Sequence, residues 1–216
     1  MDSKDSILVC FAVKEEAKFF PGISGEKGCE RLITGMGQRN AGTSIRKILS
    51  TLRPRMVITT GFAGGLNPEL KVGTVVFDED AAAGLSSKLI KLGAKPVKFN
   101  CAARVATTVE EKQALWKSSG ADVVEMESSV IRQICHEQGI PSATIRVISD
   151  AANEDLPLDF NALMTSDERI DFVKLAWKLI TGPQKIPQLI RFQKQTVFAA
   201  RKLANVLNGL LIDGRN

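Results

Sequence analysis

Ala121-Asp-Val-Val-Glu-Met-Glu-Ser-Ser129 decides the fold together with a second stretch, Ala143-Thr-Ile-Arg-Val-Ile-Ser-Asp-Ala151. Each stretch reads as an apolar strand that ends abruptly in carboxylates. Strands that are apolar along their length are typical of a sheet covered on both faces. The carboxyl ends of such strands open onto the ligand crevice, so we expect Glu127 and Asp150 to lie side by side at one edge. A buried carboxylate there must bind a ligand or hold a proton.

The rest of the chain alternates apolar segments with amphipathic ones. Strands are predicted at Ile7–Val13, Arg31–Gly35, Met56–Gly61, Val72–Phe77, Ala121–Met126 and Ala143–Ile148. Helices are predicted at Asn40–Leu52, Val109–Ser118, Ser128–Gln138 and Asp167–Ile180. Asn40 is expected to cap the first helix and Arg53-Pro54 to stop it. This alternation predicts an α/β fold, a three-layer sandwich whose central sheet is mixed and mainly parallel.

Composition indicates one large domain of a globular protein. The chain has 216 residues, of which 44% are hydrophobic and 25% charged. Its polar start and short first apolar run predict neither a signal peptide nor a membrane-spanning helix. The four cysteines have no metal or redox spacing, which indicates buried thiols in a reducing compartment, the cytoplasm. No metal-ligand cluster is recognisable, and the single histidine, His136, is expected to be structural.

The positive charge gathers in the last part of the chain. Net charge is +5, yet residues 172–212 contain no acid and seven cations, so the remainder is near neutral. A nucleic-acid partner is therefore not expected. We divide the chain into an α/β domain, residues 1–181, and a basic amphipathic helical extension, residues 182–216. Its cations Arg191, Lys194, Arg201 and Lys202 gather opposite an apolar stripe. Such a helix either contacts the inner membrane surface peripherally or packs on its own domain.

Three further segments carry candidate site residues, each with a structural alternative. Thr59-Thr-Gly-Phe-Ala-Gly-Gly-Leu66 follows a strand, and its glycines either let amides approach a phosphate or sugar or simply form a turn. Gly35-Met-Gly-Gln-Arg-Asn40 leads into a helix, where Arg39 would add charge for an anion. Glu16 closes the first strand and is either a general base for water or part of a solvated turn.

Four motifs follow one another along the chain: Ile7–Glu16, Gly61-Phe-Ala-Gly-Gly-Leu66 with Lys71-Val-Gly-Thr74, Val124-Glu-Met-Glu-Ser128 and Arg146-Val-Ile-Ser-Asp150. In this order they resemble the purine nucleoside phosphorylase and methylthioadenosine nucleosidase superfamily, over residues 7 to about 180. The resemblance implies a nucleoside phosphorylase-like fold and cleavage of the N-glycosidic bond of a small adenine nucleoside. It also implies no cofactor beyond inorganic phosphate as a co-substrate, no metal, and a homodimer or higher oligomer.

The resemblance also implies roles for individual residues. Glu127 would grip the ribose 2′- and 3′-hydroxyls, with Met126 under the sugar. Asp150 would give a proton to purine N7, oriented by Ser149, while Glu16 would activate water. Phe62, Ala63 and Gly64 would line the nucleoside. Gly61 and Arg39 would contact phosphate.

Several departures point to one branch of this superfamily. Phe62 stands where a serine is common, and the segment between Asp80 and Glu125 is short. Val105-Ala-Thr-Thr-Val-Glu-Glu-Lys112 and Gly182-Pro-Gln-Lys-Ile-Pro-Gln-Leu-Ile-Arg191 resemble the hopanoid-associated phosphorylases. That resemblance implies phosphorolysis of a lipid-linked, 5′-substituted adenosine of the adenosylhopane kind. Two alternatives remain: a hydrolase of methylthioadenosine, adenosylhomocysteine or futalosine that uses Glu16 and water, and a catalytically idle nucleoside-binding protein.

Overall fold

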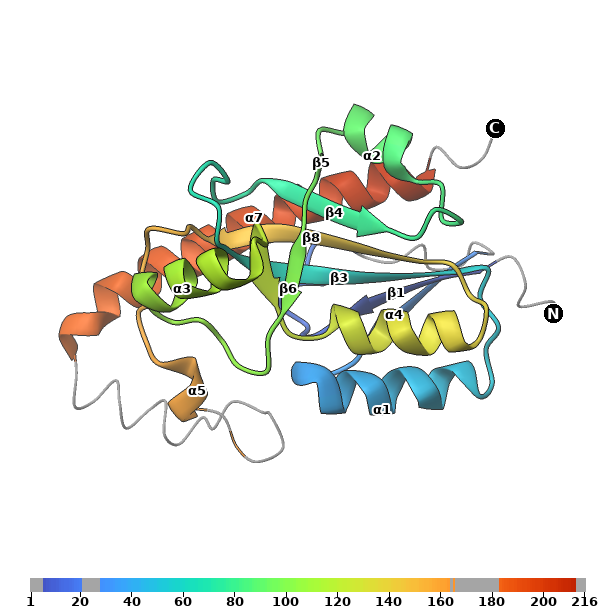
Figure 1. Cartoon of the computed structure of the whole chain (residues 1–216), viewed down its shortest axis with the longest axis horizontal. Coiled ribbons are helices and arrows are strands. Elements are labelled where there is room, and N and C mark those ends of the chain that lie inside the picture. The colour runs from blue at the N-terminus through green and yellow to red at the C-terminus, as the bar shows by residue number, and fades with distance from the viewer. Residues whose placement is uncertain (1–5, 21–27, 164, 166–182, 213–216) are drawn as a thin grey trace.

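A central sheet of eight strands organises the computed structural model, which describes residues 6–20, 28–163, 165 and 183–212 (Figure 1). The strands are β1 (Ile7–Phe11), β2 (Cys29–Ile33), β3 (Met56–Gly65), β4 (Val75–Glu79), β5 (Lys95–Pro96), β6 (Phe99–Cys101), β7 (Val123–Glu125) and β8 (Ser142–Asp150). The helices are α1 (Gly37–Leu49), α2 (Ser86–Lys91), α3 (Val109–Ser119), α4 (Ser128–Glu137), α5 (Phe160–Leu163) and α7 (Ile186–Ile212), the last preceded by a 3₁₀ turn at Pro183–Lys185.

The sheet is mixed and mainly parallel, as predicted. Its main path runs β2-β1-β3-β8-β4-β5, and β6 and β7 lie off this path. Five of the seven strand pairings are parallel, and only β3–β7 and β4–β8 are antiparallel. Because β1, β3 and β8 run in the same direction, their carboxyl ends share one edge of the sheet.

The long strand β3 changes neighbour along its length. β1 pairs with its first half, up to Thr60, and β7 pairs with its last two residues, Gly64 and Gly65. A register shift between Ala63 and Gly64 marks the change on the β8 side. Glu127 and Asp150 are predicted to lie side by side at one edge, and the strands that carry them flank the end of β3 instead of pairing with each other. β7 and β8 both pair with the end of β3, and they do so with opposite directions.

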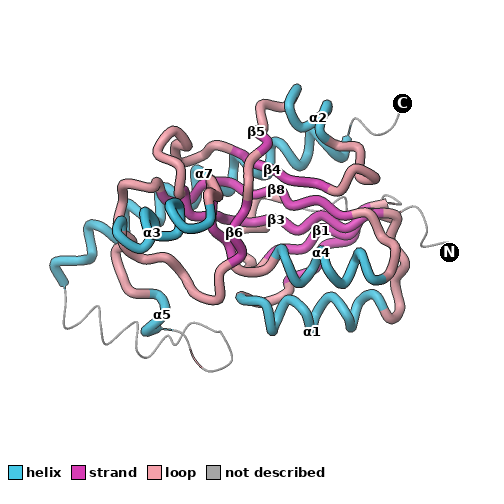
Figure 2. The backbone as a smooth tube through the Cα atoms, viewed as in Figure 1, coloured by secondary structure: helices cyan, strands magenta, loops and turns pink. Residues whose placement is uncertain are grey.

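Helices cover both faces of this sheet, which gives the predicted three layers (Figure 2). Side chains of a strand alternate between the faces, and β1 shows the result. Leu8 and Cys10 belong to a core cluster with residues of α1 and α4. Val9 and Phe11 belong to a larger cluster with residues of α2 and α7. The long apolar runs of the sequence follow from this two-sided burial.

Most predicted elements lie within a few residues of the observed ones, with three corrections. α1 begins after Met36, not at a cap by Asn40, whose side chain donates a hydrogen bond back to the Met36 carbonyl at 3.0 Å. α1 also ends at Leu49, before Arg53-Pro54. The predicted strand Val72–Phe77 is shifted to β4. The predicted helix Asp167–Ile180 lies outside the described residues.

The second half of α7 is part of the main core. Ala199, Leu203, Leu207 and Leu210 are buried in the same cluster as Phe11 of β1. The apolar stripe that could enter a membrane is thus packed on the sheet, and the guanidinium of Arg201 lies 4.7 Å from the ring centroid of Phe19. None of the helices in the described part of the chain is long and apolar enough to cross a membrane. A domain division at residue 181 stays a prediction, although α7 shares its core with residues of the first part.

We predict that α7 contributes to stability as a core layer does. Leu207→Ala, which empties a fully buried position, should lower the free energy of unfolding by about 2–5 kcal/mol in urea denaturation. Ile190→Ala on the same helix is the matched control, because Ile190 is 49% exposed and should change it by at most about 0.5 kcal/mol. Equal effects of the two substitutions would show that α7 is not held against the sheet in solution.

Candidate active site

The candidate site lies at the shared carboxyl edge of β1, β3 and β8, where ligands bind in sheets of this kind. Three carboxylates reach it from different elements. Glu16 follows β1, Glu127 stands between β7 and α4, and Asp150 ends β8. Their exposed fractions are 5%, 6% and 5%, so each carboxylate is removed from water and must be compensated.

Glu16 is held by backbone amides of two strand ends. Oε2 accepts hydrogen bonds from the amides of Ala12 at 2.8 Å and Val13 at 3.2 Å, and Oε1 accepts one from Phe62 at 2.8 Å. Gly61 has a φ of 140°, and a Cβ there would lie 2.3 Å from Oε1. Only glycine lets β3 come this close to the carboxylate. Burial raises the pKa of Glu16, and this outweighs the lowering by Arg146 and the amides.

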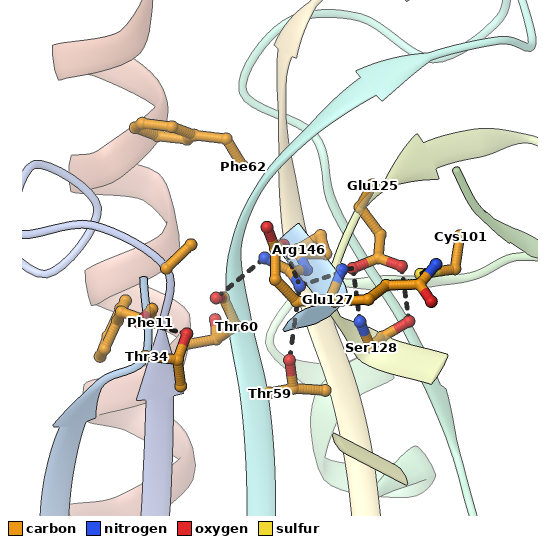
Figure 3. A network of polar contacts seen from close by, with 12 residues as sticks. Phe11, Thr34, Thr59, Thr60, Phe62, Cys101, Glu125, Glu127, Ser128 and Arg146 are labelled. Atoms are coloured by element: carbon orange, nitrogen blue, oxygen red, sulfur yellow. Dashed lines mark hydrogen bonds and ion pairs between the residues drawn. The ribbon is translucent and has the colours of Figure 1, made fainter. Parts of the chain in front are cut away.

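Arg146 is the positive centre of the site (Figure 3). It is fully buried in the middle of β8. One nitrogen, Nη2, lies 2.6 Å from Oε2 of Glu125 and 3.2 Å from Oε2 of Glu127, and Nη1 donates to the carbonyl of Thr60 at 3.0 Å. Its Nε–H has no partner among the described residues. A single guanidinium therefore ties β3, β7 and the start of α4 together.

The two glutamates of the Glu-Met-Glu motif are placed in different electrostatic surroundings. Burial alone would raise the pKa of Glu125, but Arg146 and hydrogen bonds from Ser128 and Glu127 hold it below its usual value. For Glu127, burial is the larger effect and raises the pKa from 4.5 to about 7, against the lowering by Arg146. Glu125 is thus the fixed counter-ion, and Glu127 is free to respond to a ligand.

Glu127 also contacts the first helix. Its Oε1 accepts a hydrogen bond from the amide of Gly37 at 2.8 Å, at the amino end of α1. The partial positive charge of a helix amino end favours a carboxylate at this position. With one bond to Gly37 and one to Arg146, the carboxylate keeps acceptor positions for further donors such as the hydroxyls of a sugar.

Asp150 lies on the other side of the end of β3. Oδ1 accepts a hydrogen bond from the hydroxyl of Ser149 at 2.7 Å, and that hydroxyl also lies 3.3 Å from the carbonyl of Ala63. A Cβ on Gly64 would lie 3.2 Å from Oδ2. Oδ2 forms an ion pair of 2.7 Å with Nζ of Lys112, a lysine of α3. Ser149, Ala63 and Gly64 are therefore grouped around Asp150, and the roles predicted for Ala63 and Gly64 in binding a nucleoside stay predictions.

The remaining predicted residues are less closely grouped. Met126 is partly buried between the two glutamates. The amide of Phe62 binds Glu16, and its ring packs against the core cluster that contains α7. Arg39 is exposed on the first turn of α1, and its role with phosphate stays a prediction.

Sequence reasoning assigned no role to three side chains of the site: Arg146, Glu125 and Lys112. Arg146 could have been found, because a charged residue inside an apolar strand needs a partner. Glu125 follows from Arg146 for the same reason. Lys112 gives no local signal, since lysines are common on helices and its partner is 38 residues away along the chain.

No cluster of three His, Cys, Asp or Glu side chains that could hold a metal occurs in residues 6–20, 28–163, 165 and 183–212. A surface cavity of about 790 Å³ lies beside β6 and α4 and is lined by Lys98, Cys101 and Arg132 among others. Its lining includes Ser128, which donates a hydrogen bond to Glu125, but none of the three site carboxylates.

Comparison with known proteins defines the class. Residues 11–91 and 97–181 match the family model of the phosphorylase superfamily, and the chain belongs to that superfamily, whose enzymes cleave glycosidic bonds of nucleosides. The 5′-methylthioadenosine/S-adenosylhomocysteine nucleosidase of Staphylococcus aureus (strain JH9) is 26% identical over an alignment of 180 residues, and the match covers 68% of this chain and 79% of that protein.

Solved structures share the fold. Futalosine hydrolase of Helicobacter pylori strain 26695 superposes with a TM-score of 0.69 and 16% identity, over 97% of this chain and 98% of that one. The Campylobacter jejuni 5′-methylthioadenosine/S-adenosyl homocysteine nucleosidase gives a TM-score of 0.67 and 16% identity, over 95% and 97% of the two chains. These likenesses confirm the nucleoside phosphorylase-like fold that the motifs predict.

The raised pKa of Glu127 predicts a specific dependence of stability on pH. Between pH 4.5 and 7 the folded protein keeps a proton that the unfolded chain has lost, so the free energy of unfolding falls as pH rises through this window. Glu127→Gln lacks this titration. The free energy of unfolding of this variant, relative to that of the wild type, should therefore rise from pH 4.5 to 7, by up to about 1.4 kcal/mol per pH unit.

Glu137→Gln is the matched control, because Glu137 is exposed at the other end of α4. Denaturation curves at several pH values should show no trend for this variant relative to the wild type. A difference between Glu127→Gln and the wild type that stays constant from pH 4.5 to 7 would contradict the assignment.

Proposed function

We propose that this protein is a hydrolytic nucleosidase that cleaves the N-glycosidic bond of a 5′-substituted adenine nucleoside, with methylthioadenosine or adenosylhomocysteine as the first substrates to test. The observation that carries the proposal is Glu16. It is a buried carboxylate with a raised pKa, and it is pressed against the glycine-rich end of β3. A general base is most effective when its pKa lies near the operating pH. The names of the relatives, nucleosidase and futalosine hydrolase, support the same reaction class.

The site supplies a group for each charge that the reaction creates. As the bond between C1′ and the base nitrogen breaks, its electron pair leaves with the base and positive charge grows on the ribose. Asp150 gives a proton to the base, and the carboxylate of Glu127 binds the sugar hydroxyls and stabilises the positive ring. Glu16 takes a proton from water, whose oxygen forms the new bond to C1′. The free Nε–H of Arg146 is a buried donor that a bound water or hydroxyl can satisfy.

Phosphorolysis of a lipid-linked adenosine, the expectation from the hopanoid-associated branch, is the second candidate. Phe62 is the departure that motivates it, because the serine common at this position, whose hydroxyl could hold phosphate or water, is missing. The exposed position of Arg39 supplies no buried cation for phosphate. The relatives bear names of hydrolases or nucleosidases, so hydrolysis is the stronger proposal. Peripheral membrane contact, a cytoplasmic location and a homodimer or higher oligomer stay predictions.

Phosphate separates the two reactions. We expect purified protein to release adenine from methylthioadenosine or adenosylhomocysteine in phosphate-free buffer, with free ribosyl product and no increase when phosphate is added. Liquid chromatography of the products distinguishes a free sugar from a sugar 1-phosphate. Strict dependence on phosphate would make the enzyme a phosphorylase. Failure to release base from any 5′-substituted or lipid-linked adenosine, with nucleoside binding retained, would favour the idle binding protein.

Glu16→Gln tests the proposed base. Loss of general-base catalysis should lower kcat by about 10²–10⁴-fold, since the amide cannot take a proton from water. Glu15→Gln is the matched control, because Glu15 is the exposed neighbour in the same turn and should keep wild-type activity. Hydrolysis at an unchanged rate in Glu16→Gln would remove Glu16 from the mechanism. Circular dichroism checks that both variants keep the fold.

A further inference from the structure

A lysine is the buried residue of helix α3. Of the eleven described residues of this helix, Lys112 alone is buried, and its exposed fraction is 0%. Lysine is among the residues least often buried, and a buried ammonium must be paired. The apolar residues of α3, such as Trp116, are left partly exposed. Leu115 packs α3 against a small core cluster, and the one fully buried residue of the helix is a charge directed at the candidate site.

Each hydrogen of the Lys112 ammonium has an acceptor. Nζ lies 2.7 Å from Oδ2 of Asp150, 2.8 Å from the carbonyl of Ala151 and 2.7 Å from the carbonyl of Glu154. An ammonium has three donors and no acceptor, so this set is complete. Lys112 cannot also bind substrate, and it acts on the site only through Asp150 and the turn that follows.

The other elements around Asp150 bring no competing charge in direct contact with it within the described residues. β3 contributes the backbone of Gly64, and β8 contributes the hydroxyl of Ser149. The turn after β8 contains Glu154, but its carboxylate is directed to the side-chain amide of Gln195 on α7, at 3.0 Å. Arg191 of α7 lies 3.9 Å from Glu154 and not against Asp150. Lys112 is thus the charged group that faces the Asp150 carboxylate.

We propose that Lys112 is a positioning residue that holds Asp150 against the leaving base and stabilises the carboxylate that remains once the proton has been transferred. In the reaction, Asp150 loses its proton to the base nitrogen that receives the electron pair of the broken bond, and a carboxylate remains in a buried place. The adjacent ammonium stabilises that carboxylate, since an opposite charge at hydrogen-bond distance favours the ionised form. The hydrogen bonds to Ala151 and Glu154 hold the ammonium in place. This inference rests on the proposed role of Asp150 as the acid.

Neutral and charged replacements of Lys112 separate this role from a structural one. In Lys112→Met the alkaline limb of kcat/KM should move to higher pH by about one unit or more, because the carboxylate left after proton transfer loses the ammonium beside it. The plateau of kcat should fall while KM changes little. Lys112→Arg keeps the charge and should return the limb toward the wild-type position. Lys117→Met, an exposed lysine of the same helix, is the matched control and should change neither value.

A second measurement does not depend on activity. The carboxyl carbon of Asp150, assigned by comparison with Asp150→Asn, is titrated by ¹³C NMR. Its midpoint should move to higher pH in Lys112→Met, or in Lys112→Gln if the methionine variant does not fold. Should neither fold, Lys112→Arg is titrated instead, and its midpoint must stay close to that of the wild type because the charge beside Asp150 is kept.

The outcomes are distinct. If the alkaline limb of kcat/KM and the NMR midpoint of Asp150 do not move in the neutral variants, and only stability is lost, the proposal for Lys112 is overturned. A wild-type protein that releases no base would overturn the proposed function, while the NMR titration would still test whether Lys112 controls the ionisation of Asp150. If Lys112→Arg restores the position of the alkaline limb of kcat/KM as well as the fold, the positioning role is supported.

Discussion

The site depends on a single buried guanidinium. Arg146 is buried inside β8, and it binds Glu125, Glu127 and the carbonyl of Thr60. A buried charge without a partner costs several kcal/mol, so each of these groups fixes the position of the others. The short strand β7, the start of α4 and the end of β3 are joined at this point. The carboxylates can approach one another there because the guanidinium compensates them.

The three glutamates do not share the positive charge of Arg146 equally, and their pKa values differ as a result. Glu125 takes the closer contact, with additional donors from Ser128, and stays ionised. Glu16 and Glu127 receive less compensation, so burial raises their pKa values. Environments that move the pKa values of neighbouring carboxyl groups apart are how one site holds acids and bases together. Asp150 is kept separate from this set, with its own cation on α3.

The sequence predicts the layers and the identity of the three carboxylates because both depend on local pattern. Apolar strands of β1, β3 and β8 indicate two-sided burial, and the acids that follow β1, follow β7 and end β8 are the three site carboxylates. The pairing of β7 with the end of β3 was not predictable. It depends on where β1 stops along β3, and β7 itself has only three residues. The Lys112–Asp150 pair was hidden for a related reason, since nothing in a polar helix indicates which lysine will be buried.

The position of α7 has a consequence for how the chain reaches this fold. The largest core cluster joins Phe11 and Phe77 to Leu203 and Leu210, residues that are synthesised far apart in time. Until α7 has left the ribosome, one face of the finished strands lacks its cover and presents apolar side chains to water and to other chains. Assistance by a chaperone would be needed most in that interval. A ribosome that stalls before residue 199 would leave a nascent chain that contains most of the site residues but lacks the helix that covers this face of the sheet.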